Sequence, residues 1–254
     1  QLAQLPRNST EGLGRIRHSS DLTKRLAELE TEYHKSYTRP ANSGQVAVRP
    51  CLHLQEGFVA RSINSEEDQL YVNHIALSLG PGLDSGRLRF AWQDTADNSE
   101  ILRTCFAPLE KEIVQVVLTP GGAISWTEDE YDSLEDCIKE QRARQQEISR
   151  GIIKNMTDVP PVRFHLATLS SKRPLVLFIA IHHALYDGES FSMLLEDVAA
   201  RYVGEPVTRR GSPAAFIDHV YGQNLEKAQQ HWVNALSDCQ PTTLPWFHHG
   251  GRRS

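Results

Sequence analysis

Apolar positions along the chain follow strand-like spacing in some segments and helix-like spacing in others. The clearest strand is the uninterrupted apolar run of residues 175–181, which is typical of a strand buried on both faces. In residues 190–202 the apolar side chains recur at helical intervals: Phe191, Leu194, Leu195, Val198 and Tyr202. The polar stretch between them is therefore predicted to lie at a strand-to-helix junction, where a rigid scaffold can position functional side chains.

The remaining pattern predicts a mixture of strands and helices. Helices are expected over residues 55–62, 84–95 and 132–150, and strands over residues 71–79, 113–118, 123–126 and 162–169. The strands 113–118 and 123–126 are expected to pair around Gly121-Gly122. Trp92, Phe106, Trp126 and Phe178 are expected to fill the core. This order of elements favours an α/β sandwich.

Residues 1–45 form a separate, more polar region. Leu22, Leu26, Leu29 and Tyr33 fall on one helical face, which predicts an amphipathic helix within a linker. Pro, Asn and Gly in residues 38–44 favour turn or extended backbone, so the domain is expected to start near Val46.

Composition excludes several classes of function. The 254 residues carry a net charge of −5 without a basic stripe, so nucleic acid is not expected as a partner. No run of 18 apolar residues indicates a membrane span, and no signal-like segment is evident, so a cytosolic location is expected. The four cysteines form no Cys-x-x-Cys pair, and His248-His249 lacks clustered ligands, so free thiols and no metal site are expected.

The candidate chemistry lies in the run Ile181-His182-His183-Ala184-Leu185-Tyr186-Asp187-Gly188-Glu189-Ser190. A neutral imidazole at His183 could take a proton from an attacking amine or hydroxyl, whereas His182 is expected to be structural. Asp187 is expected to organise the loop through a cation or backbone donors, and Gly188 to permit a backbone angle that a side chain would penalise. The alternative is two structural histidines and an Asp187 that merely caps a helix.

At these residues the chain resembles the condensation domains of nonribosomal peptide synthetases, whose defining string is His-His-x-x-x-Asp-Gly followed by Ser two residues on. Residues 50–58 (Pro-Cys-Leu-His-Leu-Gln-Glu-Gly-Phe) resemble the family's first motif, with Leu52 and His53 where Thr-Pro is usual. Residues 100–106 resemble its Leu-Arg-Thr-x-Phe motif, and residues 212–232 more weakly resemble the entry into its second lobe. The residues that fill these motifs, His-His-Ala-Leu-Tyr-Asp-Gly at 182–188 and Leu-Gln-Glu-Gly-Phe at 54–58, are similar to those of fungal synthetases that build hydroxamate siderophores.

The resemblance implies amide-bond formation between two acyl groups held as thioesters on the phosphopantetheine arms of donor and acceptor carrier domains. By position, His183 would be the catalytic histidine, which either deprotonates the acceptor amine or orients it and stabilises the tetrahedral species. Asp187 would pair with Arg103, and Gly188 would donate a backbone hydrogen bond near the reacting carbonyl. No cofactor or metal would be bound by the domain itself.

The resemblance also implies a chloramphenicol acetyltransferase-like α/β lobe. The family uses two such lobes, so the chain, which begins at Gln1 without an initiator Met, is expected to be a fragment. Residues 1–45 would be the linker, residues 46–205 the N-terminal lobe, and residues 206–254 the helical start of a largely missing C-terminal lobe.

Three further interpretations stay open. An epimerisation domain shares the His-His-x-x-x-Asp-Gly string, but would deprotonate a Cα and need a single carrier. A non-catalytic scaffold that docks carrier domains is a second alternative. A smaller acetyltransferase that uses coenzyme A is a remote third.

Overall fold

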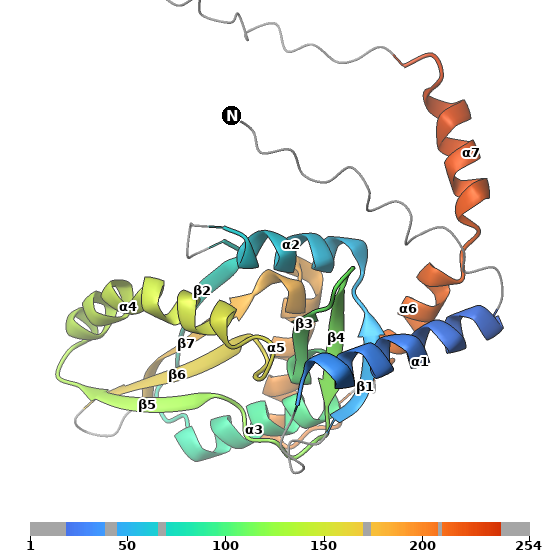
Figure 1. Ribbon diagram of the computed structural model, residues 1–254. Helices are drawn as coiled ribbons and strands as arrows, with labels where there is room; N and C mark the ends of the chain where they lie inside the picture. The colour runs from blue at the N-terminus through green and yellow to red at the C-terminus, as the bar shows by residue number, and fades with distance from the viewer. Residues whose placement is uncertain (1–18, 39–44, 66–69, 170–173, 208–209, 240–254) are drawn as a thin grey trace, which may run out of the picture.

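The computed structural model describes residues 19–38, 45–65, 70–169, 174–207 and 210–239 (Figure 1). Its helices are α1 (Ser19–Ser36), α2 (His53–Ile63), α3 (Ser85–Asn98), η1 (Glu100–Arg103), α4 (Leu134–Lys154), η2 (His183–Leu185), α5 (Gly188–Val203), α6 (Pro213–Tyr221) and α7 (Leu225–Leu236). Its strands are β1 (Gln45–Pro50), β2 (Val72–Ser78), β3 (Thr104–Pro108), β4 (Ile113–Leu118), β5 (Trp126–Tyr131), β6 (Val162–Leu169) and β7 (Pro174–His182).

The strands form two sheets. The larger has the order β2-β7-β6-β5, with β5 and β6 parallel and the other neighbours antiparallel. The smaller has the order β1-β4-β3 and is antiparallel throughout. The predicted strand over residues 175–181 is therefore central in its sheet, as its continuous apolar run requires.

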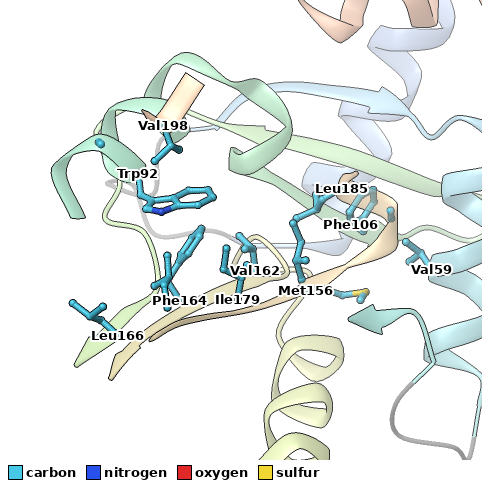
Figure 2. Close-up of a cluster of buried hydrophobic side chains, with 14 of the residues drawn as sticks. Val59, Trp92, Phe106, Met156, Val162, Phe164, Leu166, Ile179, Leu185 and Val198 are labelled. Carbon is cyan, nitrogen blue, oxygen red and sulfur yellow. The ribbon is translucent and has the colours of Figure 1, made fainter. Parts of the chain in front are cut away.

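The main core lies on one face of the larger sheet. Figure 2 shows Trp92 from α3 over Phe164 from β6, with their ring centroids 4.6 Å apart. Helix α5 adds Val198 to the same cluster, and η2 adds Leu185. Alternate residues of β6 (Val162, Phe164 and Leu166) are at most 4% exposed and all belong to this cluster. Because successive side chains of a strand point to opposite faces, these alternate residues place one face of the sheet in the apolar core.

Helix α4 covers the opposite face of the larger sheet (Figure 1). It begins at the N-cap Ser133, whose hydroxyl accepts a hydrogen bond from the Asp136 N–H. Ile152 packs on Val72 and Ala180 near one end of the helix, and Cys137 packs near Ala167 at the other. Between these two apolar contacts the helix meets a more polar part of the sheet.

The smaller sheet has a core of its own under α1. Leu29 and Tyr33 are at most 1% exposed and pack on Val48, Val114 and Val116. The Tyr37 hydroxyl donates to the Pro108 carbonyl at 2.6 Å. The amphipathic helix predicted from this spacing is therefore confirmed and packs on the domain.

Helices α6 and α7 differ in how they contact the rest of the fold. Ile217 of α6 is buried, and Tyr221 donates to the Cys51 carbonyl at 2.6 Å. All described residues of α7 are exposed, including Trp232 and Val233. The proposed boundaries at residues 45 and 205 remain predictions.

One pairing expected from the sequence is wrong. The strand at residues 113–118 pairs with β1 and β3, and the next strand begins only at Trp126 and runs parallel to β6. Gly121, with a φ of 90°, forms a turn that leads from one sheet to the other. The two glycines correctly indicated that the chain turns here, but they could not show which strand would be the partner.

In the described part of the chain, no helix combines the length and hydropathy of a transmembrane span. The four cysteines are free, and Cys51, Cys105 and Cys137 are buried.

Candidate active site

The central strand β7 carries both candidate histidines to the edge of the core. His182 is the last residue of β7, and His183 begins the short helix η2 that leads into α5. The His182 N–H donates to the Pro161 carbonyl at 2.9 Å, and the His183 N–H donates to the Tyr71 carbonyl at 2.7 Å. The predicted strand-to-helix junction is confirmed, with one turn of η2 inserted between the two elements.

The imidazole of His183 stacks with two aromatic rings. Phe58 of α2 and Tyr186 each have a ring centroid 5.1 Å from that of His183. The Tyr186 hydroxyl accepts a hydrogen bond from the Asn73 amide at 2.6 Å, which fixes that ring in turn. These contacts define the plane of the half-buried imidazole.

The hydrogen bond of His183 also determines which of its nitrogens is protonated. Nδ1 lies 2.8 Å from the Tyr186 carbonyl oxygen, and a carbonyl can only accept, so Nδ1 must carry the hydrogen. In the neutral ring Nε2 therefore keeps its lone pair. This is the nitrogen that can accept a proton.

Tyr71 supports this site with an unusual backbone. Its φ of 63° lies in the left-handed region, which is uncommon for a bulky residue. In this conformation its carbonyl accepts the His183 N–H, and its ring lies 4.6 Å from that of Phe58. Backbone strain of this kind often occurs at functional sites.

His182 has a structural role. It is fully buried, its Nδ1 accepts from the Ala184 N–H at 3.2 Å, and its Nε2 lies 2.8 Å from the Ser62 hydroxyl. Ser62 can donate onward to the carbonyl of Phe58 or Leu70. Burial, with a smaller contribution from His183, lowers the pKa of His182 to about 4, so the ring is neutral near pH 7.

Asp187 organises the junction through backbone donors, which is one of its two expected roles. It is the N-cap of α5, and its Oδ1 accepts from the Ser190 N–H at 2.8 Å and the Ser190 hydroxyl at 2.7 Å. The Ser190 hydroxyl accepts from the Asp187 N–H in return. The bonds from the Ser190 N–H and hydroxyl lower the pKa of Asp187.

The expected pairing of Asp187 with Arg103 is wrong. The Arg103 guanidinium donates from Nε to the Ala96 carbonyl at 3.0 Å and from Nη1 to the Leu118 carbonyl. Arg103 therefore joins η1 and α3 to the end of β4, while Asp187 is occupied at its helix cap. The spacing of two motifs along the chain could not show that backbone carbonyls compete for the arginine.

The special backbone angle expected of Gly188 is not found, whereas its expected backbone hydrogen bond to the reacting carbonyl stays a prediction. Gly188 is the first residue of α5, its φ is not positive, and a Cβ built there would meet no atom within 4 Å. The backbone thus has no need of glycine at this position. Its effect is to leave an exposed position bare of a side chain at the start of the helix.

The site residues that the sequence reasoning did not identify come from α2 and from Tyr71, which directly precedes β2. The Gln55 amide donates to the Ala184 carbonyl at 2.9 Å, while its Oε1 accepts from the Leu52 N–H at 3.0 Å. Gln55, Phe58 and Ser62 follow helical spacing along α2 and all reach the residues around His182 and His183. That helical spacing could have identified these three residues from the sequence. No sequence pattern indicated a role for Tyr71.

Among the described residues, no three His, Cys, Asp or Glu side chains are grouped to hold a metal ion. What the site offers is a fixed imidazole, a capped helix and two supporting aromatic rings.

The fold matches solved domains of the chloramphenicol acetyltransferase-like type. In this mixed α/β fold the buried strand β7 ends at His182, directly before His183. The crystal structure of holo T3CT superposes with a TM-score of 0.67 at 24% identity, over 85% of this chain and 49% of that one. The epimerization domain from the third module of tyrocidine synthetase B superposes with a TM-score of 0.62 at 19% identity, over 82% of this chain and 48% of that one. The expected fold class is confirmed.

The family follows from the sequence comparisons. The condensation domain family model matches residues 46–248. A nonribosomal peptide synthetase, sidC of Aspergillus fumigatus, is 96% identical over 242 residues, which cover 95% of this chain and 5% of that synthetase. The chain belongs to the condensation domain family, whose members are acyltransferase-type domains that form peptide bonds in nonribosomal peptide synthetases.

Proposed function

We propose that this chain takes part in amide-bond formation between donor and acceptor acyl groups, each held as a phosphopantetheine thioester on a carrier domain, and that His183 is the catalytic residue. The observation that carries the proposal is the fixed tautomer of His183, whose Nδ1–H is held by the Tyr186 carbonyl. This leaves the Nε2 lone pair for the attacking amine.

In the proposed reaction the acceptor amine attacks the donor thioester carbonyl. A C–N bond forms, the C–S bond breaks, and the thiol leaves on the donor phosphopantetheine. His183 Nε2 either takes the amine proton and returns it to the leaving sulfur, or orients the amine and stabilises the tetrahedral species. Because the thioester is already activated, alignment of two tethered groups supplies most of the acceleration, roughly 7 to 11 kcal/mol in good intramolecular reactions.

The other site residues would position this machinery. Asp187 would hold the start of α5, His182 would anchor the end of β7, and Arg103 would brace η1. Gly188 would leave room for the reacting carbonyl next to the first N–H groups of α5.

The domain itself would bind no cofactor, and its partners would be donor and acceptor carrier domains and the adjacent domains of a synthetase. Residues 46–205 would be its N-terminal lobe and residues 206–254 the start of the C-terminal lobe. From the likeness of its motifs we propose a siderophore as the product class and the cytoplasm as the location.

The test is mass spectrometry of the products formed by the synthetase that contains this sequence, with separately loaded donor and acceptor carriers. His183→Ala should lower amide formation by about 10²- to 10⁴-fold, the usual contribution of a general acid–base group. The matched control is His231→Ala, which removes an exposed histidine of α7 and should leave the rate unchanged.

Two other outcomes would overturn the proposal. Inversion of the Cα configuration with one loaded carrier and no acceptor would indicate an epimerase. Carrier binding without product, unaffected by His183→Ala, would indicate a scaffold.

A further inference from the structure

A cavity of about 330 Å³ lies between α4 and the outer face of the larger sheet, away from His183. This volume falls in the range of small-molecule sites, roughly 300 to 1,000 Å³. Its apolar wall includes Ile75, Ile148 and Phe178, and its polar wall includes Thr127, Arg163 and His165. No Asp or Glu is among the described residues that line it.

Arg163 is the group in this cavity that most needs a partner. It lies on β6 between Val162 and Phe164, so strand alternation directs it away from the apolar core and toward α4. Its side chain is partly buried, and no described residue forms a hydrogen bond or ion pair with its guanidinium. Removing a cation from water without a counter-charge is unfavourable, so an anion that entered the cavity would relieve this cost.

Gly151 of α4 makes the space for this guanidinium. A Cβ built at Gly151 would lie 2.8 Å from Nη2 and 3.0 Å from Nη1 of Arg163, closer than such contacts allow. The φ of Gly151 is not in the left-handed region, so the backbone has no need of glycine here. The missing side chain therefore serves the placement of Arg163.

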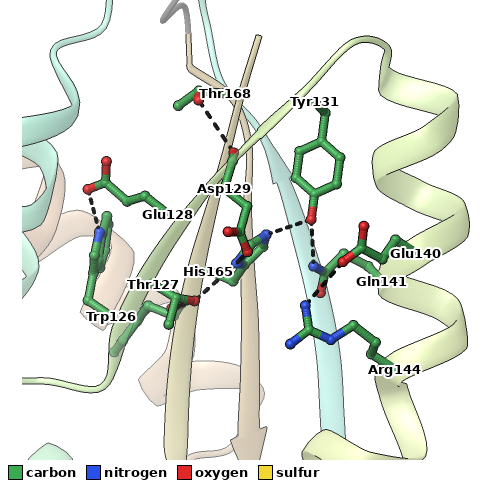
Figure 3. Close-up of polar contacts among 11 residues, drawn as sticks. Trp126, Thr127, Glu128, Asp129, Tyr131, Glu140, Gln141, Arg144, His165 and Thr168 are labelled. Atoms are coloured by element: carbon green, nitrogen blue, oxygen red, sulfur yellow. Dashed lines mark hydrogen bonds and ion pairs between the residues drawn. The ribbon is translucent and has the colours of Figure 1, made fainter. Parts of the chain in front are cut away.

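Two other polar groups of the wall, His165 and Arg144, already have contacts of their own. Figure 3 shows His165 between Thr127 and Tyr131, with its Nδ1 3.0 Å from the Thr127 hydroxyl and its Nε2 3.3 Å from the Tyr131 hydroxyl. Arg144 donates to Glu140 at 3.1 Å. Burial lowers the pKa of His165, against a smaller opposing effect of Asp129, so this ring adds hydrogen bonds rather than charge near pH 7.

We propose that this cavity binds a small organic carboxylate with an apolar body, its carboxylate on the Arg163 guanidinium and its apolar body against Phe178 and Ile148. The planar guanidinium can hold a carboxylate by two parallel hydrogen bonds. The site is separate from His183, and the inference does not depend on the proposed function.

The direct test compares hexanoate with hexanamide, which has the same body without the charge. Isothermal titration calorimetry on the full chain should show hexanoate binding at least tenfold more tightly than hexanamide. In spectra of isoleucine methyl groups, hexanoate should shift Ile75 and Ile148, which line the cavity, and leave Ile217 of α6 unchanged. Equal binding of the two compounds, or no binding of hexanoate, would overturn the proposal.

Two variants test whether the Arg163 guanidinium is the group that binds the carboxylate. Arg163→Met keeps the apolar stem, and Gly151→Ala keeps the arginine but displaces its guanidinium, so each should weaken hexanoate binding at least tenfold. The matched control, Arg89→Met, removes an exposed arginine of α3 on the other side of the sheet and should bind as the native chain does. Native affinity in folded Arg163→Met would contradict the assignment, and the hexanamide comparison decides if a variant does not fold.

Discussion

The two faces of the larger sheet are built by different rules, although they share the same strands. Along β6, Val162, Phe164 and Leu166 enter an apolar core, whereas Arg163 and His165 point toward α4. On the first face side chains interlock, as Trp92 does over Phe164 (Figure 2). On the second face polar groups bond to one another around a cavity (Figure 3). One face is thus suited to stability and the other to polar chemistry.

The largest expected effect is a difference in stability between substitutions at two neighbouring positions of β6, one on each face of the sheet. Phe164→Ala should lower the free energy of unfolding by about 3 to 5 kcal/mol, because it opens a hole in a close-packed core. Arg163→Met should change it by less than about 1 kcal/mol, because it breaks no hydrogen bond or ion pair with a described residue. Urea denaturation measures both, and equal losses would contradict the distinction.

The second effect concerns pH. The pKa of His182 is lowered to about 4, chiefly by burial, against about 6.5 in an unfolded chain. Between these values the unfolded state binds the extra proton, so the free energy of unfolding should fall as the pH drops from about 6.5 to 4. The total loss should be about 3 kcal/mol from this histidine. Burial also lowers the pKa of His74 and of His165, which add in the same direction.

Urea denaturation at pH 7 and pH 4.5 checks this loss. His182→Gln should be less stable at pH 7 and should depend less on pH, while His231→Gln, an exposed control, should keep the native profile. A profile for His182→Gln as steep as that of the native chain would show that other groups dominate the acid response.

A smaller effect is expected where the sheet meets α5. Asp187→Ala should cost about 1 kcal/mol, the usual contribution of an N-cap. Asp84→Ala removes the matching cap of α3 and should cost a similar amount. Amide formation by the synthetase should fall only for Asp187→Ala. Equal activity of the two variants would mean that Asp187 has no role beyond the cap.

The smallest effect lies in the polar network itself. Tyr131→Phe should lower stability by about 0.5 to 1 kcal/mol, because its contacts with His165 and Gln141 are long, at 3.3 and 3.4 Å. Thermal unfolding measures this change, and nitrogen chemical shifts of the His165 ring should report the lost contact. A loss as large as that of Phe164→Ala would mean that the polar face also carries the core of the fold.

The sequence predicted most of the local structure. The apolar run of β7 and the helical spacing of α5 specified the junction that holds His183, because both signals are contained within neighbouring residues. Which strands pair with one another was harder to predict from the sequence. Strand β5 pairs with β6 across the whole of α4, and no local turn signal encodes such a pairing.

The site was predictable in its reactive residues but not in their surroundings. His183, His182 and Asp187 come from one string, and their positions follow from it. Phe58 and Tyr71 reach His183 from distant segments, and the left-handed φ of Tyr71 has no sequence signature. Arg103 shows the same limit, because the backbone carbonyls that accept its hydrogen bonds, those of Ala96 and Leu118, could not be identified from the sequence.

The parallel pairing of β5 with β6 determines where α4 lies relative to the sheet. A parallel pair needs a crossover, and crossovers of this kind are right-handed in nearly every known fold. Chain connectivity therefore dictates the side of the sheet on which α4 lies, whatever residues it meets there. The helix should therefore keep its side of the sheet even when the residues around Arg163 are replaced, whereas the Phe164 face depends on the side chains packed there.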